Sequence, residues 1–349
     1  MEFLTEYGLF LAKIITIVVA LIFIAGLIVS SKQRSQGKGH IEVIKLNDQF
    51  DDYSETIKQS VLDNNALKLE HKQQKKRDKL EAKARKLASK NKEEPPPAKK
   101  RVFVLDFDGD IKASAGENLR EEITAILSLA EERDEVVVRL ESGGGMVHSY
   151  GLAASQLARL SEKNIPLTVC VDKVAASGGY MMACVGNKIL AAPFAVLGSI
   201  GVVAQLPNFH RLLKKHDVDY ELFTAGEYKR TVTVFGENTE KGKEKFLEDI
   251  EQTHVLFKEF VSEHRPVVDM EQVATGEVWY GRRALEMQLI DEIATSDSYL
   301  QGQHPQADIL QVSFKQKKSL QEKMGVAAEG TIDRLLLKWV ARLQSARWF

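Results

Sequence analysis

Ser177 is the residue whose surroundings best suit covalent chemistry. It lies in the segment AASGGY, after an apolar run at Pro166–Val171 that is typical of a buried strand, and before the apolar run YMMACV, which predicts a buried helix. Serine beside glycine is common in turns, so the residue pair alone does not separate a nucleophile from a cap. A serine at a helix start would lie near the positive end of the helix dipole, which favours an oxyanion, and the amide of Gly178 would point to the same place.

A second glycine cluster, Gly143–Gly145, follows the predicted strand Glu135–Leu140. Loops at the carboxyl ends of parallel strands are where α/β proteins place their sites, and glycine lets the backbone approach a ligand closely. The amide of Gly145 is therefore a candidate second donor beside that of Gly178. Two converging N–H groups are what a tetrahedral intermediate of acyl transfer requires.

The base that would activate Ser177 is not obvious from the histidines. His148 alone among the eight follows a glycine-marked strand end, and it falls at a helix start where a solvent-facing side chain is expected. No G-x-S-x-G elbow surrounds Ser177, so a Ser-His-Asp triad is not indicated. Lysine is the remaining candidate, although lysines are numerous and usually solvated.

The cysteines and the charged residues argue against a metal site and a nucleic-acid site. Cys170 and Cys184 both lie in apolar context with no C-x-x-C spacing, which favours core packing over a metal site, and the sequence leaves open whether they pair. The first 101 residues sum to +7 and the remainder to −8. In the basic stretch 67–101, 14 Lys/Arg stand against 5 Asp/Glu with no aromatic residue for base stacking, so a charged spacer is favoured over a nucleic-acid site.

From residue 102 onward, short apolar runs alternate with helical patterns. Strands are predicted at Val102–Phe107, Glu135–Leu140 and Pro166–Val171, with a long amphipathic helix at Lys243–Glu263 and a later strand at Glu277–Trp279. This rhythm of strand and helix predicts an α/β fold with a mostly parallel sheet and covering helices.

Both ends of the chain suggest contact with a membrane. Gly8–Ser30 is 23 residues long with one charge, which is long enough to span a bilayer, and its flanks lack the features of a cleaved signal peptide. At the other end, Thr331–Phe349 is amphipathic and predicts a helix that docks either on protein or on the bilayer surface. We therefore expect four regions: an anchor at 1–39 with its helix at about 8–30, a charged linker at 40–101, a catalytic domain at 102–318 and an amphipathic C-terminal helix at 319–349.

Three motifs in order resemble the signal peptide peptidase (SppA) family, and the N-terminal anchor, basic spacer and length are most similar to its SohB branch. The motifs are ASGGYMMA around Ser177, GSIGVV at Gly198–Val203 and AGEYKRTVTVF at Ala225–Phe235. Any one of them would be weak evidence, whereas the ordered set is specific.

This resemblance implies a ClpP/crotonase-like fold with a Ser–Lys dyad. By motif, Ser177 is the nucleophile, Lys229 the general base, and the amides of Gly145 and Gly178 form the oxyanion hole, with Ser199 a candidate orienter of the lysine. No metal or cofactor is implied. In relatives the serine and lysine meet across a domain or subunit boundary, which implies a homo-oligomer for a single-domain chain.

The resemblance also implies peptide substrates, such as signal peptides or unfolded polypeptides, and a bacterial inner-membrane location. Relatives place their active sites on the periplasmic face, whereas the basic residues after the anchor favour the cytoplasmic face; protease accessibility in spheroplasts distinguishes the two. The chain departs from the family pattern in lacking a proline at Gly143 and in carrying Gln288 where relatives have glycine. We assign the segment Gly276–Ile293 to the scaffold.

Two other functions fit parts of the sequence. An acyl-CoA hydratase or isomerase of the same fold would use the glycine loops but leave Ser177 and Lys229 without a purpose, and it would not need a membrane anchor. A catalytically inactive membrane scaffold would predict no effect of Ser177→Ala. Labelling by a serine-reactive fluorophosphonate separates the protease from both.

Overall fold

The computed structural model describes residues 39–63, 65–69, 72, 75–76, 79–80, 83 and 99–316. Residues Ile41–Phe314 form one compact unit. The predicted anchor at 8–30, most of the basic stretch 67–101 and the predicted C-terminal helix lie outside the described residues. Among those that are described, no helix combines the length and apolar character needed to cross a bilayer.

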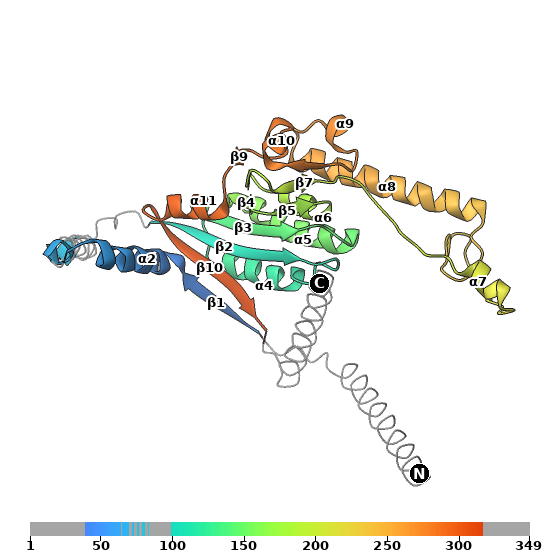
Figure 1. Ribbon diagram of the computed structural model, residues 1–349, viewed down its shortest axis with the longest axis horizontal. Coiled ribbons are helices and arrows are strands. Elements are labelled where there is room, and N and C mark those ends of the chain that lie inside the picture. The colour runs from blue at the N-terminus through green and yellow to red at the C-terminus, as the bar shows by residue number, and fades with distance from the viewer. Residues whose placement is uncertain are drawn as a thin grey trace, which may run out of the picture. The chain divides into compact units, whose positions relative to one another are not determined.

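The compact unit alternates strands and helices along the chain (Figure 1). In chain order its elements are β1 (His40–Lys45), α2 (Leu46–Val61), β2 (Lys100–Gly109), α4 (Gly116–Leu127), β3 (Glu135–Ser142), α5 (Val147–Ser161), β4 (Leu167–Val171), β5 (Val174–Ala176), α6 (Gly178–Ala183), β6 (Lys188–Ala191), β7 (Val196–Gly198), α7 (His210–Lys215), α8 (Glu240–His264), α9 (Met270–Val273), β8 (Val278–Tyr280), α10 (Gly281–Glu286), β9 (Glu292–Ile293), α11 (Ser296–Gln303) and β10 (Ala307–Lys315).

The strands form one mixed sheet in the order β1-β10-β2-β3-β4-β6-β9, and the pairs from β10 to β9 are parallel. β5 and β7 extend the sheet from the end of β3 as parallel strands, and β8 closes this extension by pairing antiparallel with β7. The predicted α/β fold with a mostly parallel sheet is therefore confirmed. The assignment to the ClpP/crotonase-like class stays a prediction.

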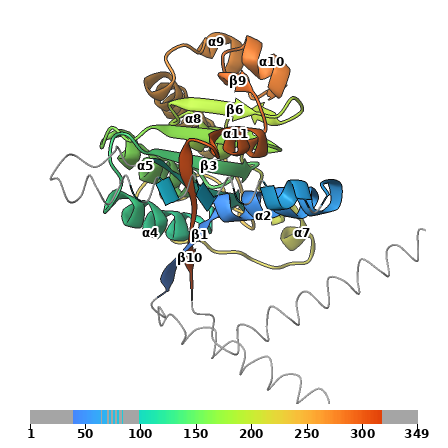
Figure 2. The same cartoon turned by 90° about the vertical axis from the view of Figure 1, so that its left-hand side faces the viewer.

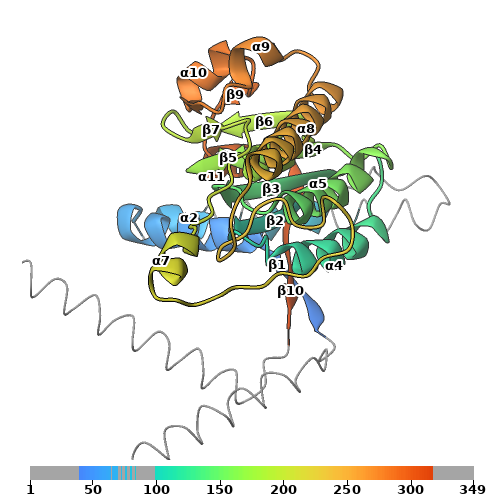
Figure 3. The ribbon, with the colours of Figure 1, turned by 90° about the vertical axis from the view of Figure 1, so that its right-hand side faces the viewer.

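Alternation along each central strand divides the core between two faces of the sheet. On β2, Phe103, Leu105 and Phe107 pack with α4, α5, α6 and α8, whereas Val102 and Val104 pack with α2 and α11. The side-on views show these helices distributed around the sheet (Figures 2 and 3). Because the central strands are covered on both faces, they read as continuous apolar runs in the sequence.

The domain extends further toward the N-terminus than the expected boundary at residue 102. Residues His40–Lys45, which the sequence analysis assigned to the linker, form the edge strand β1, and β2 already begins at Lys100. The exposed residues of β1 give it no clear strand signal, because only Ile41 packs against the core. Its pairing with β10 is a contact across the whole chain, which a local pattern does not reveal.

A left-handed turn at Gln288 forms without a glycine. Gln288 has φ of 59°, and its carbonyl accepts a hydrogen bond from Nε of the buried Arg265 at 2.7 Å. Arg265 is itself paired with Asp291 at 2.9 Å. The guanidinium therefore holds a turn whose backbone conformation disfavours side chains.

Asn47 joins the start of α2 to the sheet and yields a test of this docking. Its side-chain amide donates to the carbonyl of Ala307 at 2.9 Å and accepts from the amide of Ile309 at 2.7 Å. The side chain thus makes the pair of hydrogen bonds that the backbone of a neighbouring strand would make with β10. Asn47→Ala leaves both buried backbone groups unpaired, and we expect the free energy of unfolding in urea to fall by about 2 kcal/mol or more.

The matched control is Gln49→Ala, because Gln49 bonds only Tyr53 on the exposed side of the same helix. We expect this variant to unfold within about 0.5 kcal/mol of the unmodified chain. Equal losses in the two variants would show that Asn47 does not pin α2 to the sheet.

Candidate active site

The two glycine clusters meet at one place in the fold. A Cβ atom added to Gly144 would lie 2.6 Å from the amide nitrogen of Gly178 and 2.8 Å from Cβ of Ser177. The loop after β3 thus rests directly on the turn between β5 and α6, as expected for loops at the ends of adjacent parallel strands. Gly144, at φ of 87°, makes this contact, whereas Gly145 packs against the backbone of Ile111.

Ser177 stands in a strained backbone conformation at the tip of its turn. Its φ is 52° and its ψ −120°, a combination that residues other than glycine rarely adopt. The amide of Ser177 donates to the carbonyl of Gly198 at 2.8 Å, which ties the turn to the end of β7. The six residues of the following helix α6 are all buried, as the sequence predicted, while Ser177 itself is half-buried.

Ser177 is not alone in its positive φ at this turn. Ser199, which follows Gly198, also has a positive φ of 51°, and the glycines in contact with the turn, Gly144 and Gly198, have φ of 87°. Left-handed conformations of non-glycine residues cost free energy and are frequent at functional sites, where the surrounding structure holds them in place. The two strained serines therefore support this turn as the candidate active site.

One amide in each glycine cluster is a candidate donor, because it has no acceptor in the described part of the chain. One belongs to Gly178, in the first turn of α6, where helical amides lack an intrahelical partner. The other belongs to Gly145, whose neighbours are both occupied: Gly144 donates to Oγ of Ser142 at 3.0 Å and Met146 to the carbonyl of Ile111 at 2.8 Å. Free N–H groups of this kind are what an oxyanion site needs.

Trp279, which the sequence analysis assigned to the scaffold, supports the same turn. Its ring occupies the space where Gly198 lacks a side chain, because an added Cβ atom would lie 2.7 Å from Cδ1 of the indole. The neighbouring Glu277 carbonyl accepts from the amide of Ser199 at 2.6 Å. The indole N–H is buried without a partner among the described residues, and an unpaired buried donor lowers the free energy of unfolding. Only the tertiary contact between β7 and β8 reveals this role.

Lys229 does not reach Ser177 within one protomer. Its neighbours are fixed to the start of α8: Glu227 pairs with Lys241 at 2.5 Å, and Tyr228 lies under the ammonium groups of Lys241 and Lys245. α8 next meets the Ser177 region at His254, whose ring contacts the Ile200 carbonyl at 3.3 Å. At 1.5 Å per residue, these two points are about 14–20 Å apart along the helix.

The segment around Lys229 is exposed and extends away from the sheet. α7 and the loops beside it lie at the far end of α8 (Figures 1 and 3). Lys229 has no ion-pair partner in the described residues. The structure therefore brings Ser177, Ser199 and the two glycine loops together but leaves the predicted base apart from them.

The remaining candidates fall outside this site. His148 is exposed at the start of α5, as expected for a solvent-facing residue. Cys170 and Cys184 are free and buried, and burial raises the pKa of the Cys170 thiol to about 12, so both act as core residues. In the described ranges no group of His, Cys, Asp and Glu is arranged to hold a metal ion.

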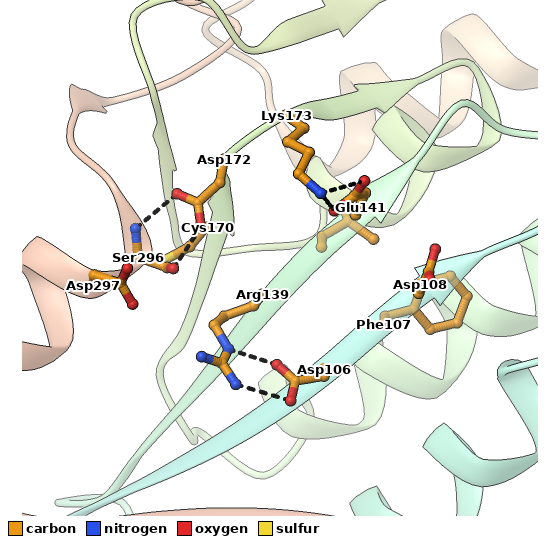
Figure 4. Close-up of a pocket in the computed structure, with 11 residues that line it drawn as sticks. Asp106, Phe107, Asp108, Arg139, Glu141, Cys170, Asp172, Lys173, Ser296 and Asp297 are labelled. Carbon is orange, nitrogen blue, oxygen red and sulfur yellow. Dashed lines mark hydrogen bonds and ion pairs between the residues drawn. The ribbon is translucent and has the colours of Figure 1, made fainter. Parts of the chain in front are cut away.

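A separate cavity of about 350 Å³ lies on the α2 and α11 face of the sheet (Figure 4). Two of its carboxylates are paired, Asp106 with Arg139 at 2.5 Å and Glu141 with Lys173 at 2.8 Å, whereas Asp108, Asp172 and Asp297 leave the lining with a net formal charge of −3. No residue of the Ser177 turn lines it. The cavity is therefore distinct from the candidate active site.

The contact between the two glycine loops can be tested by adding single methyl groups. Gly144→Ala places a Cβ atom against the Gly178 amide at a position with φ of 87°, and we expect the free energy of unfolding to fall by about 2 kcal/mol or more. Gly143→Ala is the control, because nothing lies within 4 Å of its added Cβ. Urea unfolding of both variants measures the difference, and equal stability would contradict the packing described above.

Known proteins are similar to this chain over nearly its whole length. The model of the N-terminal part of peptidase family S49 matches residues 2–157, and the family S49 peptidase model matches residues 159–309. The chain is 53% identical over 337 residues to "Probable protease SohB" of Haemophilus influenzae, covering 94% of each chain. It is 51% identical over 306 residues to the protein of the same name from Buchnera aphidicola subsp. Schlechtendalia chinensis, covering 86% of this chain and 99% of that one.

Among solved structures, the membrane-bound stomatin-specific protease 1510-N in complex with a substrate peptide aligns with a TM-score of 0.40 and 13% identity. The alignment covers 65% of this chain and 97% of that one. The two family models and the sequence identity to whole relatives agree, so the chain belongs to peptidase family S49.

Proposed function

We propose that the protein is a membrane-anchored serine endopeptidase that hydrolyses signal-peptide-like or unfolded polypeptides with Ser177 and Lys229. The observation that carries this proposal is the strained Ser177 turn, which lies beside the unoccupied amide of Gly178 and in contact with the loop that bears Gly145. Strain at a half-buried serine beside free backbone donors supports a site of acyl transfer.

In the proposed reaction, the neutral amine of Lys229 takes the proton of the Ser177 hydroxyl as its oxygen attacks the peptide carbonyl. The amides of Gly145 and Gly178 donate to the developing oxyanion, and the amine product leaves with a proton from Lys229. Water then attacks the acyl-enzyme, and Lys229 again accepts and returns the proton. Ser199, held beside Ser177 through Gly198, is placed in this scheme as the orienter of the lysine.

A second copy of the chain would complete the site. The segment from residue 202 to 239 carries Lys229 and has many exposed apolar side chains: Val203, Leu206, Phe209, Leu212, Val218, Tyr220, Leu222, Phe223, Tyr228 and Phe235. Phe223 is 86% exposed and Val203 81%. An apolar surface of this extent is typical of an interface, and its burial against a neighbour would also remove water from Lys229, as a neutral lysine requires.

The proposal predicts that both side chains are essential and can be supplied by different copies. We expect Ser177→Ala and Lys229→Ala, each purified as the full chain in detergent, to cleave an unfolded polypeptide at least about 10³-fold more slowly than the unmodified protein. Mixing the two inactive variants under conditions of subunit exchange should restore part of the activity.

Lys214→Ala is the control, since Lys214 is an exposed lysine of the same segment. It should retain cleavage, and a fluorophosphonate should label Ser177 in the unmodified protein. Cleavage that survives Ser177→Ala would reject the serine mechanism and favour a function of the crotonase type or an inactive scaffold.

Membrane anchoring is tested separately by deleting residues 1–38. We expect the full chain to remain with the bacterial inner membrane after alkaline carbonate extraction, because Gly8–Ser30 is long enough to span it. The truncated chain should appear in the supernatant or associate only weakly through its C-terminal segment. Release of the full chain by carbonate would remove the anchor from the proposal.

A further inference from the structure

A line of four hydrogen-bonding groups lies beneath the glycine loop. The amide of Gly144 donates to Oγ of Ser142 at 3.0 Å, Oγ of Ser142 lies 2.5 Å from the hydroxyl of Tyr150, and that hydroxyl donates to the carbonyl of Asp110 at 2.7 Å. Ser142 is 2% exposed and Tyr150 fully buried. The line connects the loop to β3, α5 and the segment after β2.

The direction of each hydrogen bond in this line follows from the carbonyl of Asp110 at its end. A carbonyl oxygen only accepts, so the single proton of Tyr150 is directed at Asp110. The hydroxyl of Ser142 then donates to the phenol oxygen at 2.5 Å, which is much shorter than its 3.4 Å distance to the Gly109 carbonyl, and its own oxygen accepts from Gly144. Burial raises the pKa of the Tyr150 phenol, so this proton stays in place at neutral pH. Donors that all point one way polarise one another and give a stiffer connection than separate bonds.

The ring of Tyr150 meets the second glycine cluster directly. A Cβ atom added to Gly178 would lie 2.5 Å from Cγ of Tyr150, so only glycine lets this amide settle on the ring. One side chain therefore contacts both sides of the site: through its hydroxyl and Ser142 it holds Gly144, and through its ring it supports Gly178.

We propose that Tyr150, acting through Ser142, is the positioning residue of the oxyanion hole. The hydrogen bond to Ser142 turns the amide of Gly144 away from the substrate and fixes the loop, so that the next amide, that of Gly145, faces the reacting carbonyl. Neither Tyr150 nor Ser142 touches the substrate. This inference rests on the proposed peptidase function and assigns the residues that set its geometry.

The test measures kcat and KM for peptide cleavage by the full chain with Tyr150→Phe, Ser142→Ala and both changes together. We expect each single variant to lower kcat about tenfold with KM within about twofold of the unmodified protein, less than the roughly hundredfold or greater loss caused by removing an oxyanion donor itself. Because the two hydroxyls act as one unit, the double variant should be no slower than either single variant.

Tyr180→Phe is the matched control. Tyr180 is also fully buried, and its hydroxyl donates to the Leu289 carbonyl at 2.9 Å and bonds Arg265, away from the loop. It should lose a similar amount of thermal stability and keep its kcat, which separates positioning from general destabilisation. All assays are run well below the melting temperature of the least stable variant.

A kcat for Tyr150→Phe equal to that of Tyr180→Phe, or additive losses in the double variant, would overturn the proposal. If Tyr150→Phe fails to fold, Ser142→Ala alone tests the proposal: a lower kcat with an unchanged KM supports it, and an unchanged kcat overturns it. Failure of the peptidase function itself would be recognised differently, because Ser177→Ala would then cleave as well as the unmodified protein.

Discussion

The structure depends on the contact of two backbones with no side chains between them. Gly144 rests on the Ser177–Gly178 turn so closely that one added carbon would overlap a backbone amide. Glycine alone permits this approach and also the left-handed conformation that Gly144 adopts. Because main-chain amides are rigid, donors fixed by such a contact need little reorganisation when charge develops near them.

Holding this contact requires support from several directions. The carbonyl of Gly198 takes the amide of Ser177, and Trp279 fills the space that Gly198 leaves open. On the other side, Tyr150 carries Gly178 on its ring and Gly144 through Ser142. Each support comes from a different strand or helix, so the strain at Ser177 is shared by the core instead of being borne by one loop.

In the proposed mechanism, the site is incomplete in a single copy. Residues 202–239 leave the sheet at Gly201, and Tyr228 lies at the start of α8, about three to four helical turns from the His254 contact with Ile200. A serine hydroxyl without an adjacent base is a weak nucleophile. Activity that depends on assembly would follow from this separation and would limit cleavage by isolated copies.

The sequence by itself determined the elements and the residue types of the site. Apolar runs such as Pro166–Val171 predicted central strands, and the glycine clusters at their ends predicted where the loops converge, because both signals depend on neighbours in the chain. The same local information predicted Ser177 as a candidate nucleophile.

The tertiary structure decided what distant segments do to one another. It placed β1 against β10, Trp279 against Gly198 and Tyr150 under both glycine loops, and it kept the Lys229 segment away from Ser177 within one copy. From the sequence, a tyrosine or tryptophan within an apolar pattern is predicted only to be buried. The partner of its hydroxyl or ring edge is set when the chain folds. Local periodicity encodes burial, and partners separated by tens or hundreds of residues are fixed only by packing.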